Sequence, residues 1–251
     1  MYMASSQIET GDRKFVVFID SMGPDDVQNN MEFTHEHVFD GQLERTDPYV
    51  TPTVMGSIYT GKEPAEHGLP AVSHYEQEAR TRPGRITLPE IAAESNEIGN
   101  VMSLGLPFIV PPQAQPSGEY WHSSDAMGKQ IFTPQQAQPL MQVPGPAGDL
   151  SNLDEDGPLF THRMDNVRGT FQAARTLADE RDFEVVFVAC RIPDSYCHYR
   201  FRNGLSTGVT DRDLLLGGVI DEEIQQLTTL GDVFVFGDHG ATDLEHVFRV
   251  N

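Results

Sequence analysis

The stretch DVFVFGDHGATD, residues 232–243, runs from a short apolar segment directly into an acid and an imidazole. Its apolar residues are valine and phenylalanine, which favour a strand. A run that is apolar almost without interruption is typical of a strand covered on both faces. Asp238 and His239 follow at once. The stretch therefore predicts a buried strand with an acid and an imidazole at its carboxyl end.

Two other runs have the same character, KFVVFI at residues 14–19 and FEVVFVAC at residues 183–190. Segments with apolar residues near helical spacing precede the last two strands, at residues 162–181 and 210–231. A weaker copy of this helix and strand unit spans residues 88–104. Helix followed by strand, repeated, predicts an α/β fold with a mostly parallel sheet sandwiched between helices.

Residues 105–158 differ in composition, because they hold nine of the 17 prolines together with many glutamines and glycines. Regular structure should be sparse there, and a stretch of this length is usually a lid or binding segment, or disordered. Tyr120, Trp121 and Phe132 favour an ordered loop. We therefore expect one domain over residues 1–251 that carries a Pro-rich lid or insertion.

The charge balance excludes some partners. Thirty-eight Asp and Glu against 17 Lys and Arg give a net charge of -21, so no basic nucleic-acid-binding surface is expected. The acids are scattered along the chain, as in salt-adapted (halophilic) proteins, although an ordinary acidic protein is the alternative. The chain has two cysteines, and none of its apolar runs approaches the roughly 20 residues that span a bilayer. These features predict a soluble cytoplasmic protein without a membrane partner.

An aspartate follows each of the three strong strands: Asp20, Asp194 and Asp238. Ligands of open α/β sheets bind beyond the carboxyl ends of the strands, so these acids should converge. His239 is adjacent to Asp238, and His198 lies four residues after Asp194. Carboxylates and imidazoles at such spacing are ordinary ligands of zinc or a similar divalent ion. Each aspartate alone could instead form a turn or cap a helix, but the combination favours a metal site.

A nucleophile is available in DPYVTPTVMGSIYTGKEPAEHGL, residues 47–69. Thr51 followed by Pro52 has the form of a helix start, and Gly61 closes the short helix. Such a helix start presents free backbone N–H groups that suit a phosphate. A hydroxyl there could attack phosphorus if a metal lowered its pKa. The alternative is that Thr51 merely caps the helix.

Together these residues resemble the alkaline phosphatase superfamily, in particular its type I phosphodiesterase and nucleotide pyrophosphatase branch. The likeness covers about residues 15–243. It rests on the strand-end Asp20, a Thr nine residues before TGKEPAEHG, the PDSxxH pattern of Asp194 and His198, and DHGATD. The stretch LGLPFIVPP also looks like that of short prokaryotic members.

The resemblance implies an alkaline-phosphatase-like fold and a metal-dependent hydrolase of phosphodiesters or nucleotide pyrophosphates, with a small phosphate ester or nucleotide as substrate. It implies two divalent ions, zinc or alternatively manganese. One ion would be held by Asp20, Thr51, Asp238 and His239, and the other by Asp194, His198 and one further histidine. Thr51 would attack phosphorus in line and form a covalent phosphothreonine, which water then hydrolyses.

Two departures from the family pattern qualify this expectation. Many members carry an Asn that holds a phosphate oxygen three residues after the nucleophile, where this chain has Val54, so substrate binding should differ or weaken. The family's last histidine ligand lies well beyond the DHG motif, whereas here only His246 remains and the chain stops thirteen residues after Asp238. The second site is then completed by His246 or is missing by truncation.

These departures leave an alternative function, an inactive or truncated relative that binds metal or phosphate. A sulfatase is disfavoured because that branch needs a Cys or Ser for conversion to formylglycine, and Thr51 cannot be converted. The cofactor-independent phosphoglycerate mutase branch usually employs Ser and is a lesser rival.

Overall fold

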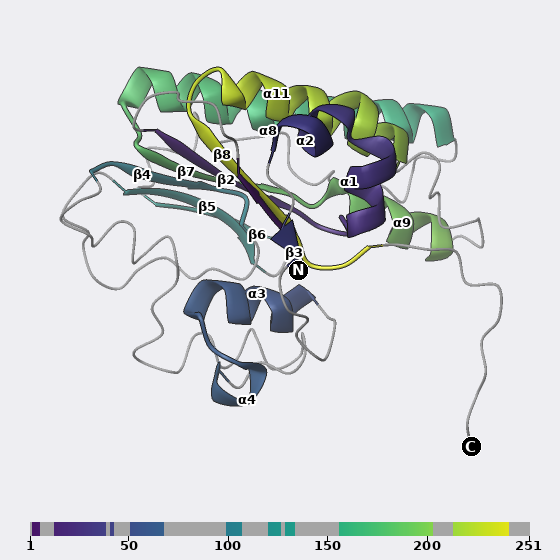
Figure 1. Ribbon diagram of the computed structural model, residues 1–251, viewed down its shortest axis with the longest axis horizontal. Coiled ribbons are helices and arrows are strands. Elements are labelled where there is room, and N and C mark those ends of the chain that lie inside the picture. Colours follow the sequence, from purple (N-terminus) through teal and green to yellow (C-terminus); the bar gives the residue numbers. More distant parts are fainter. Residues whose placement is uncertain are drawn as a thin grey trace.

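A computed structural model describes residues 2–5, 13–38, 41–42, 51–67, 99–106, 120–126, 129–133, 156–202 and 213–240. These residues form an eight-stranded sheet with the strand order β3-β1-β8-β2-β7-β4-β5-β6 (Figure 1). The strands are β1 (Tyr2–Ser5), β2 (Lys14–Ile19), β3 (Gly41–Gln42), β4 (Val101–Leu104), β5 (Tyr120–Ala126), β6 (Lys129–Thr133), β7 (Val185–Cys190) and β8 (Asp232–Gly237).

Five consecutive strands, β8, β2, β7, β4 and β5, run parallel to one another. On one edge β1 pairs antiparallel with β8 and β3 pairs antiparallel with β1, and on the other edge β6 pairs antiparallel with β5. The predicted mostly parallel α/β sheet is therefore confirmed.

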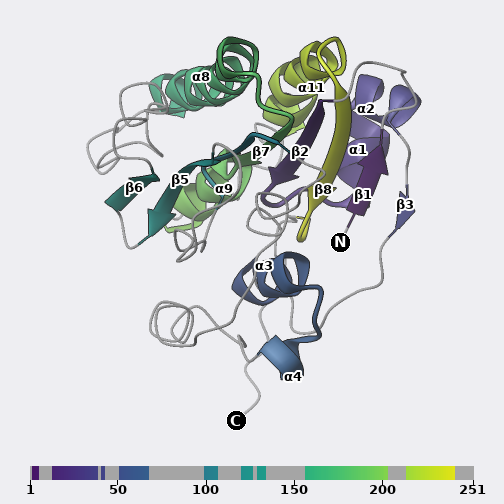
Figure 2. The same cartoon turned by 90° about the vertical axis from the view of Figure 1, so that its left-hand side faces the viewer.

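Helices cover both faces of the sheet. They are α1 (Pro24–Asn30), α2 (Glu32–His37), α3 (Thr51–Thr60), α4 (Pro64–His67), α8 (Asp156–Arg181), α9 (Ile192–Arg202), the π-helix η3 (Leu216–Ile220) and α11 (Asp221–Thr228). In Figures 1 and 2, α1, α2, α8 and α11 lie on one face, and α3 and α4 lie on the other. The sheet is thus sandwiched, as its apolar strands require.

The two faces of β2 enter two separate cores, because successive side chains of a strand point to opposite sides. Phe15, Val17 and Ile19 belong to the larger core, which also contains the buried side chains of α8 and α11. Phe18 belongs to the smaller core, together with Met55 of α3. Apolar side chains on both faces are the reason why these strands read as continuous apolar runs.

The structure agrees with most of the sequence expectations and extends them. Strands β2 and β8 have the predicted bounds, and α8 contains the predicted helix at residues 162–181. Residues 210–231, predicted as one helix, contain η3 and α11. The weaker unit supplies β4, and its helical half at residues 88–95 lies outside the described residues.

Residues 105–158 are more regular than their composition predicts. Strands β5 and β6 lie within this stretch and pair with each other, and β5 also pairs with β4. Tyr120 and Trp121 belong to β5, and Phe132 belongs to β6. The expectation of sparse regular structure is wrong for these two strands, because pairing with the sheet outweighs the surrounding Pro and Gly. Most of the other residues of this stretch lie outside the described ones, so the lid stays a prediction.

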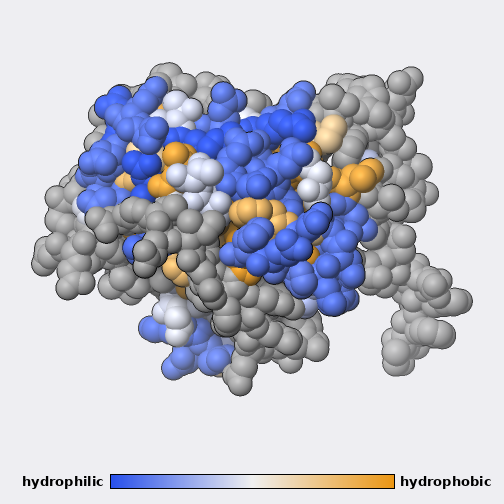
Figure 3. All heavy atoms as spheres, turned by 45° about the horizontal axis from the view of Figure 1, so that its top comes forward, coloured by the Kyte–Doolittle hydropathy of each residue, from blue (hydrophilic) through white to orange (hydrophobic). Residues whose placement is uncertain are grey.

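The face formed by α8 and α11 is mainly hydrophilic (Figure 3). Among the described residues, Leu214 is the large hydrophobic side chain that stands exposed. In the same part of the chain, every helix is too short or too polar to cross a lipid bilayer.

Candidate metal centre

The central parallel strands end level with one another. Ile19 at the end of β2 pairs with Cys190 at the end of β7 and with Gly237 at the end of β8. Asp20 and Asp238 directly follow β2 and β8, so this register places them side by side. Asp194 reaches the same edge from the first turn of α9, the helix after β7. The sequence expectation that the three acids converge at this edge agrees with the geometry.

The turns after β2 and β8 pack closely and hold Asp238 in place. Ser21 adopts the left-handed backbone conformation, with φ of 69°. Its backbone N–H donates to Asp238 Oδ1 at 3.2 Å, and the N–H of His239 donates to the same oxygen at 3.0 Å. A side chain at Gly237 would collide with the carbonyl oxygen of Met22, so only glycine permits this close approach.

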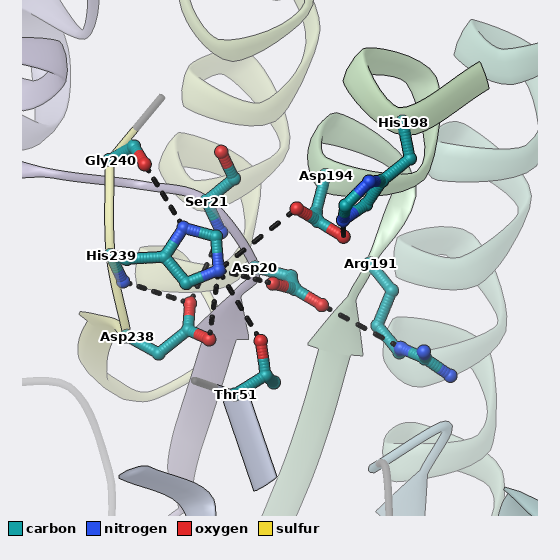
Figure 4. Close-up of polar contacts among 9 residues, drawn as sticks. All are labelled: Asp20, Ser21, Thr51, Arg191, Asp194, His198, Asp238, His239 and Gly240. Atoms are coloured by element: carbon teal, nitrogen blue, oxygen red, sulfur yellow. Dashed lines mark hydrogen bonds and ion pairs between the residues drawn. The ribbon is translucent and has the colours of Figure 1, made fainter. Parts of the chain in front are cut away.

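The imidazole of His239 lies at the centre of the cluster (Figure 4). Its Nε2 is 3.3 Å from Thr51 Oγ1, 3.4 Å from Asp238 Oδ2, 3.6 Å from Asp20 Oδ1 and 4.0 Å from Asp194 Oδ1. Its Nδ1 lies 3.0 Å from the carbonyl oxygen of Gly240. Because a carbonyl only accepts, Nδ1 donates its proton to Gly240, and Nε2 faces the four oxygens.

The oxygen and nitrogen atoms of this cluster suit a bound cation, because the described residues leave two carboxylate oxygens without a hydrogen bond. Asp20 Oδ1 and Asp238 Oδ2 are buried and accept no hydrogen bond from the described residues. Asp20, Asp194 and His239 each offer one ligand atom, and the three atoms lie within 4.8 Å of one another. Buried acceptors without a donor are costly unless a metal ion binds them. Two carboxylates and an imidazole form a typical set of ligands for a divalent ion.

The electrostatics of the cluster lead to the same conclusion. Burial raises the pKa of Asp20 well above its usual range, and the charges of Asp238 and Asp194 raise it further, whereas Arg191 and a hydrogen bond from Thr51 lower it. Burial also raises the pKa of Asp194, an effect that His198 and His239 oppose. Without a cation, crowding therefore favours the protonated carboxyl groups.

The family resemblance implies two sets of metal ligands, and Asp194 contacts members of both. Its Oδ1 faces His239, and its Oδ2 lies 3.4 Å from Nε2 of His198, four residues further along α9. The side chain of His198 is 64% exposed, so a ligand can reach it. His246, the candidate third ligand of the second set, lies outside the described residues.

Helix α3 presents Thr51, and not its neighbours, to the cluster. Thr51 is the first residue of α3 and is partly exposed. Thr53 is 0% exposed and Val54 is 1% exposed, so neither side chain is open to a ligand. Gly61 follows the helix with φ of 65°, as expected for a glycine that ends a helix. Thr51 is thus the hydroxyl of this segment that a substrate at the cluster can reach.

Sequence reasoning missed Ser21 and Arg191. The left-handed turn at Ser21 has no signal in the sequence, because glycine or asparagine would normally mark it. Arg191 directly follows β7, and its Nε lies 3.7 Å from Asp20 Oδ2. Arg191 could have been found by its position after a strand, because the three aspartates were identified in this way.

The family model described as type I phosphodiesterase / nucleotide pyrophosphatase matches residues 15–251. No curated protein and no solved structure matches the chain.

Proposed function

Because the chain belongs to the type I phosphodiesterase / nucleotide pyrophosphatase family, we propose that it is a metal-dependent hydrolase that uses Thr51 as its nucleophile. The substrates are phosphodiesters or nucleotide pyrophosphates, cleaved through a covalent phosphothreonine. The observation that carries the proposal is the position of the Thr51 hydroxyl, 3.3 Å from His239 Nε2 and hydrogen-bonded to Asp20. A hydroxyl without such neighbours is a weak nucleophile.

In this proposal, side chains of the cluster bind the metal ions. Asp20, Asp238, His239 and Thr51 hold one divalent ion, and Asp194 and His198 contribute to a second. Zinc suits the mixed carboxylate and imidazole donors, and manganese is the alternative. Bound ions supply charge stabilisation to the phosphoryl group and lower the pKa of hydroxyl groups near them.

The chain's own residues perform the remaining steps. The start of α3 directs its backbone N–H groups toward the phosphoryl oxygens, which binds and orients the group. Thr51 Oγ1 attacks phosphorus and gives up its proton to solvent, the bond to the leaving oxygen breaks as the new Oγ–P bond forms, and the leaving oxygen takes up a proton from solvent. Water then cleaves that bond, which releases phosphate or its monoester and restores the Thr51 hydroxyl. Asp238, held by two backbone N–H groups, keeps the adjacent His239 in place throughout.

The test compares hydrolysis of p-nitrophenyl phosphate and bis-p-nitrophenyl phosphate by the purified protein at molar KCl with zinc or manganese added. The proposal predicts activity that requires the metal and is lost after chelation. A protein that binds metal and is folded but hydrolyses neither ester contradicts the proposal, and an inactive binding relative would then be the better description.

A further inference from the structure

Two glycines bring the turn after β2 into contact with the turn after β8. A side chain at Gly23 would place its Cβ 3.0 Å from the Cα of Gly240, closer than carbon atoms normally pack. A side chain at Gly240 would meet the Cα of Gly23 at 3.5 Å. The carbonyl oxygen of Gly240 lies 3.0 Å from His239 Nδ1 (Figure 4). The turn after β2 therefore packs against the residue whose carbonyl group contacts the imidazole of His239.

Asp26 holds the turn at Gly23. Helix α1 has Gly23 as its N-cap and Pro24 as its first residue, and Asp26 stands at its third position. The Asp26 carboxylate accepts a hydrogen bond from the backbone N–H of Gly23 at 2.6 Å. The accepting oxygen, Oδ2, is also 3.8 Å from the position that a Cβ at Gly240 would take. The carboxylate thus lies close to both glycines.

Capping α1 does not by itself account for the burial of Asp26. The residue is 6% exposed, whereas the neighbouring Asp25 in the same first turn is exposed. A negative charge is favourable near the amino end of a helix, and this effect does not require burial. Burying a carboxylate is costly unless hydrogen bonds compensate. The buried position is explained by the contact between the two turns, which the carboxylate is placed to stabilise.

The turn that Asp26 holds is also bonded to the metal centre. The backbone N–H of Ser21 donates to Asp238 Oδ1, and the N–H of His239 donates to the same oxygen. The carbonyl group of Met22 packs against Gly237, directly before Asp238. A shift of residues 21–23 would therefore displace Asp238 and His239 together.

We infer that Asp26 is a positioning residue of the metal centre, which fixes Asp238 and the imidazole of His239 by holding the turn at residues 21–23. Asp26 acts through the backbone and does not itself bind the metal. The inference rests on the proposed function, because it takes Asp238 and His239 as metal ligands. Removing a residue that orients metal ligands typically lowers metal affinity by about 10- to 100-fold.

The test compares wild type with Asp26→Ala, Asp26→Asn and a matched control, Asp25→Ala. The control removes the same charge from the first turn of the same helix, but at an exposed residue. Zinc affinity is measured by calorimetry, and the free energy of unfolding by denaturant titration. Backbone amide exchange of the metal-free proteins is measured by NMR, and hydrolysis of the two p-nitrophenyl esters in parallel.

We expect Asp26→Ala to bind zinc about 10- to 100-fold more weakly than wild type. In the metal-free protein, the amide of His239 should exchange about tenfold faster, as expected when a hydrogen bond to a charged group is weakened. Amides in the middle of β8 should keep their rates, because the opening is local. Asp26→Asn should recover part of both effects, since its side-chain oxygen can still accept from Gly23. Asp25→Ala should equal wild type in both measurements.

Gly23→Ala tests the contact between the turns directly and keeps the carboxylate of Asp26. Its added methyl group would press against Gly240, so zinc affinity should fall and the exchange of the His239 amide should accelerate. This variant decides the question if Asp26→Ala does not fold. Wild-type zinc affinity and wild-type exchange at His239 in Gly23→Ala would then overturn the inference.

Unchanged zinc affinity in a folded Asp26→Ala overturns the inference, and so does unchanged exchange at His239. Equal acceleration at all amides of β8 also overturns it, because Asp26 would then stabilise the whole fold and not this turn. The failure of the proposed function looks different: wild type binds no metal or hydrolyses neither ester. The exchange of the His239 amide, measured without metal, still decides in that case whether Asp26 holds the turn.

Discussion

The Nε2 of His239 lies 3.3 Å from the hydroxyl oxygen of Thr51, although 188 positions separate the two residues in the sequence. This distance joins the turn after β8 to the first residue of α3, a helix that covers the opposite face of the sheet from α8 and α11. Thr51, the proposed nucleophile, and His239 are therefore supplied by different layers of the fold. The activity should depend on the packing of α3 against the strand ends as well as on the side chains themselves.

The first prediction concerns metal binding by Asp20. Asp20→Asn keeps the shape of the side chain but removes a buried charge, so the variant should bind one metal ion fewer per chain and lose nearly all turnover. Elemental analysis of the dialysed protein measures the metal content.

Asp182→Asn is the matched control for this variant. Asp182 is 97% exposed, lies between α8 and β7 at the far edge of the sheet, and has φ of 53°, which asparagine tolerates. It removes the same charge and should keep the wild-type metal content. Equal metal content in Asp20→Asn and wild type would show that Asp20 is not a ligand.

The second prediction concerns the pH dependence of the metal-free protein. Burial raises the pKa of Asp20 and of Asp194, so the folded state holds protons that the unfolded state releases above its pKa of about 3.9. The free energy of unfolding should therefore decrease as the pH rises from about 3.9 through the raised folded pKa values. Denaturant titrations at successive pH values measure this slope.

Asp20→Asn separates this effect from that of the many surface carboxylates. The variant has no carboxyl group at this position to titrate, so the stability of its metal-free form should fall less steeply with rising pH than that of wild type. Identical slopes for the two proteins would mean that Asp20 does not titrate abnormally.

Much of this arrangement could be predicted from the sequence, because it depends on buried strands. The apolar runs identified β2, β7 and β8, and parallel strands bring the residues after them, Asp20, Asp194 and Asp238, to one edge. The strands β1, β3, β5 and β6 could not be predicted, since they are defined by pairing at the sides of the sheet and not by an apolar run. Helices α1 and α2 were missed because they are short.

The atomic detail of the site could not be predicted, because it depends on the backbone conformation of the turns after the strands. The sequence places Arg191 after a strand but does not say that its side chain turns toward Asp20. The family resemblance assigns Asp194 and His239 to different metal sites, whereas the structure places their ligand atoms in one group with Asp20. Such relations follow from local backbone geometry, for example the left-handed Ser21, which a residue pattern does not encode.

The third prediction concerns salt. With a net charge of -21, the folded chain is subject to strong repulsion among its carboxylates, and molar salt reduces the screening length to about 3 Å. The thermal unfolding midpoint should rise between low and molar KCl, and NaCl should act similarly if screening is the cause. Equal midpoints at both concentrations would contradict salt adaptation.

The fourth prediction separates a catalytic from a capping role of Thr51. Thr51→Ala should cost about 1 kcal/mol of stability if the side chain also caps α3. Thr51→Ser should keep partial activity, because a hydroxyl remains to attack. Thr53→Ala is the internal control: Thr53 is 0% exposed, so this variant should lose stability but keep its turnover per folded molecule.

The most direct test of the proposed function is the rate at which metal-loaded Thr51→Ala hydrolyses bis-p-nitrophenyl phosphate, compared with wild type at equal metal content. Loss of the nucleophile should lower kcat by a factor on the order of 10³ or more while the protein stays folded and keeps most of its metal. A Thr51→Ala protein as active as wild type would contradict the phosphothreonine mechanism, and loss of activity in Thr53→Ala alone would assign the nucleophile to Thr53.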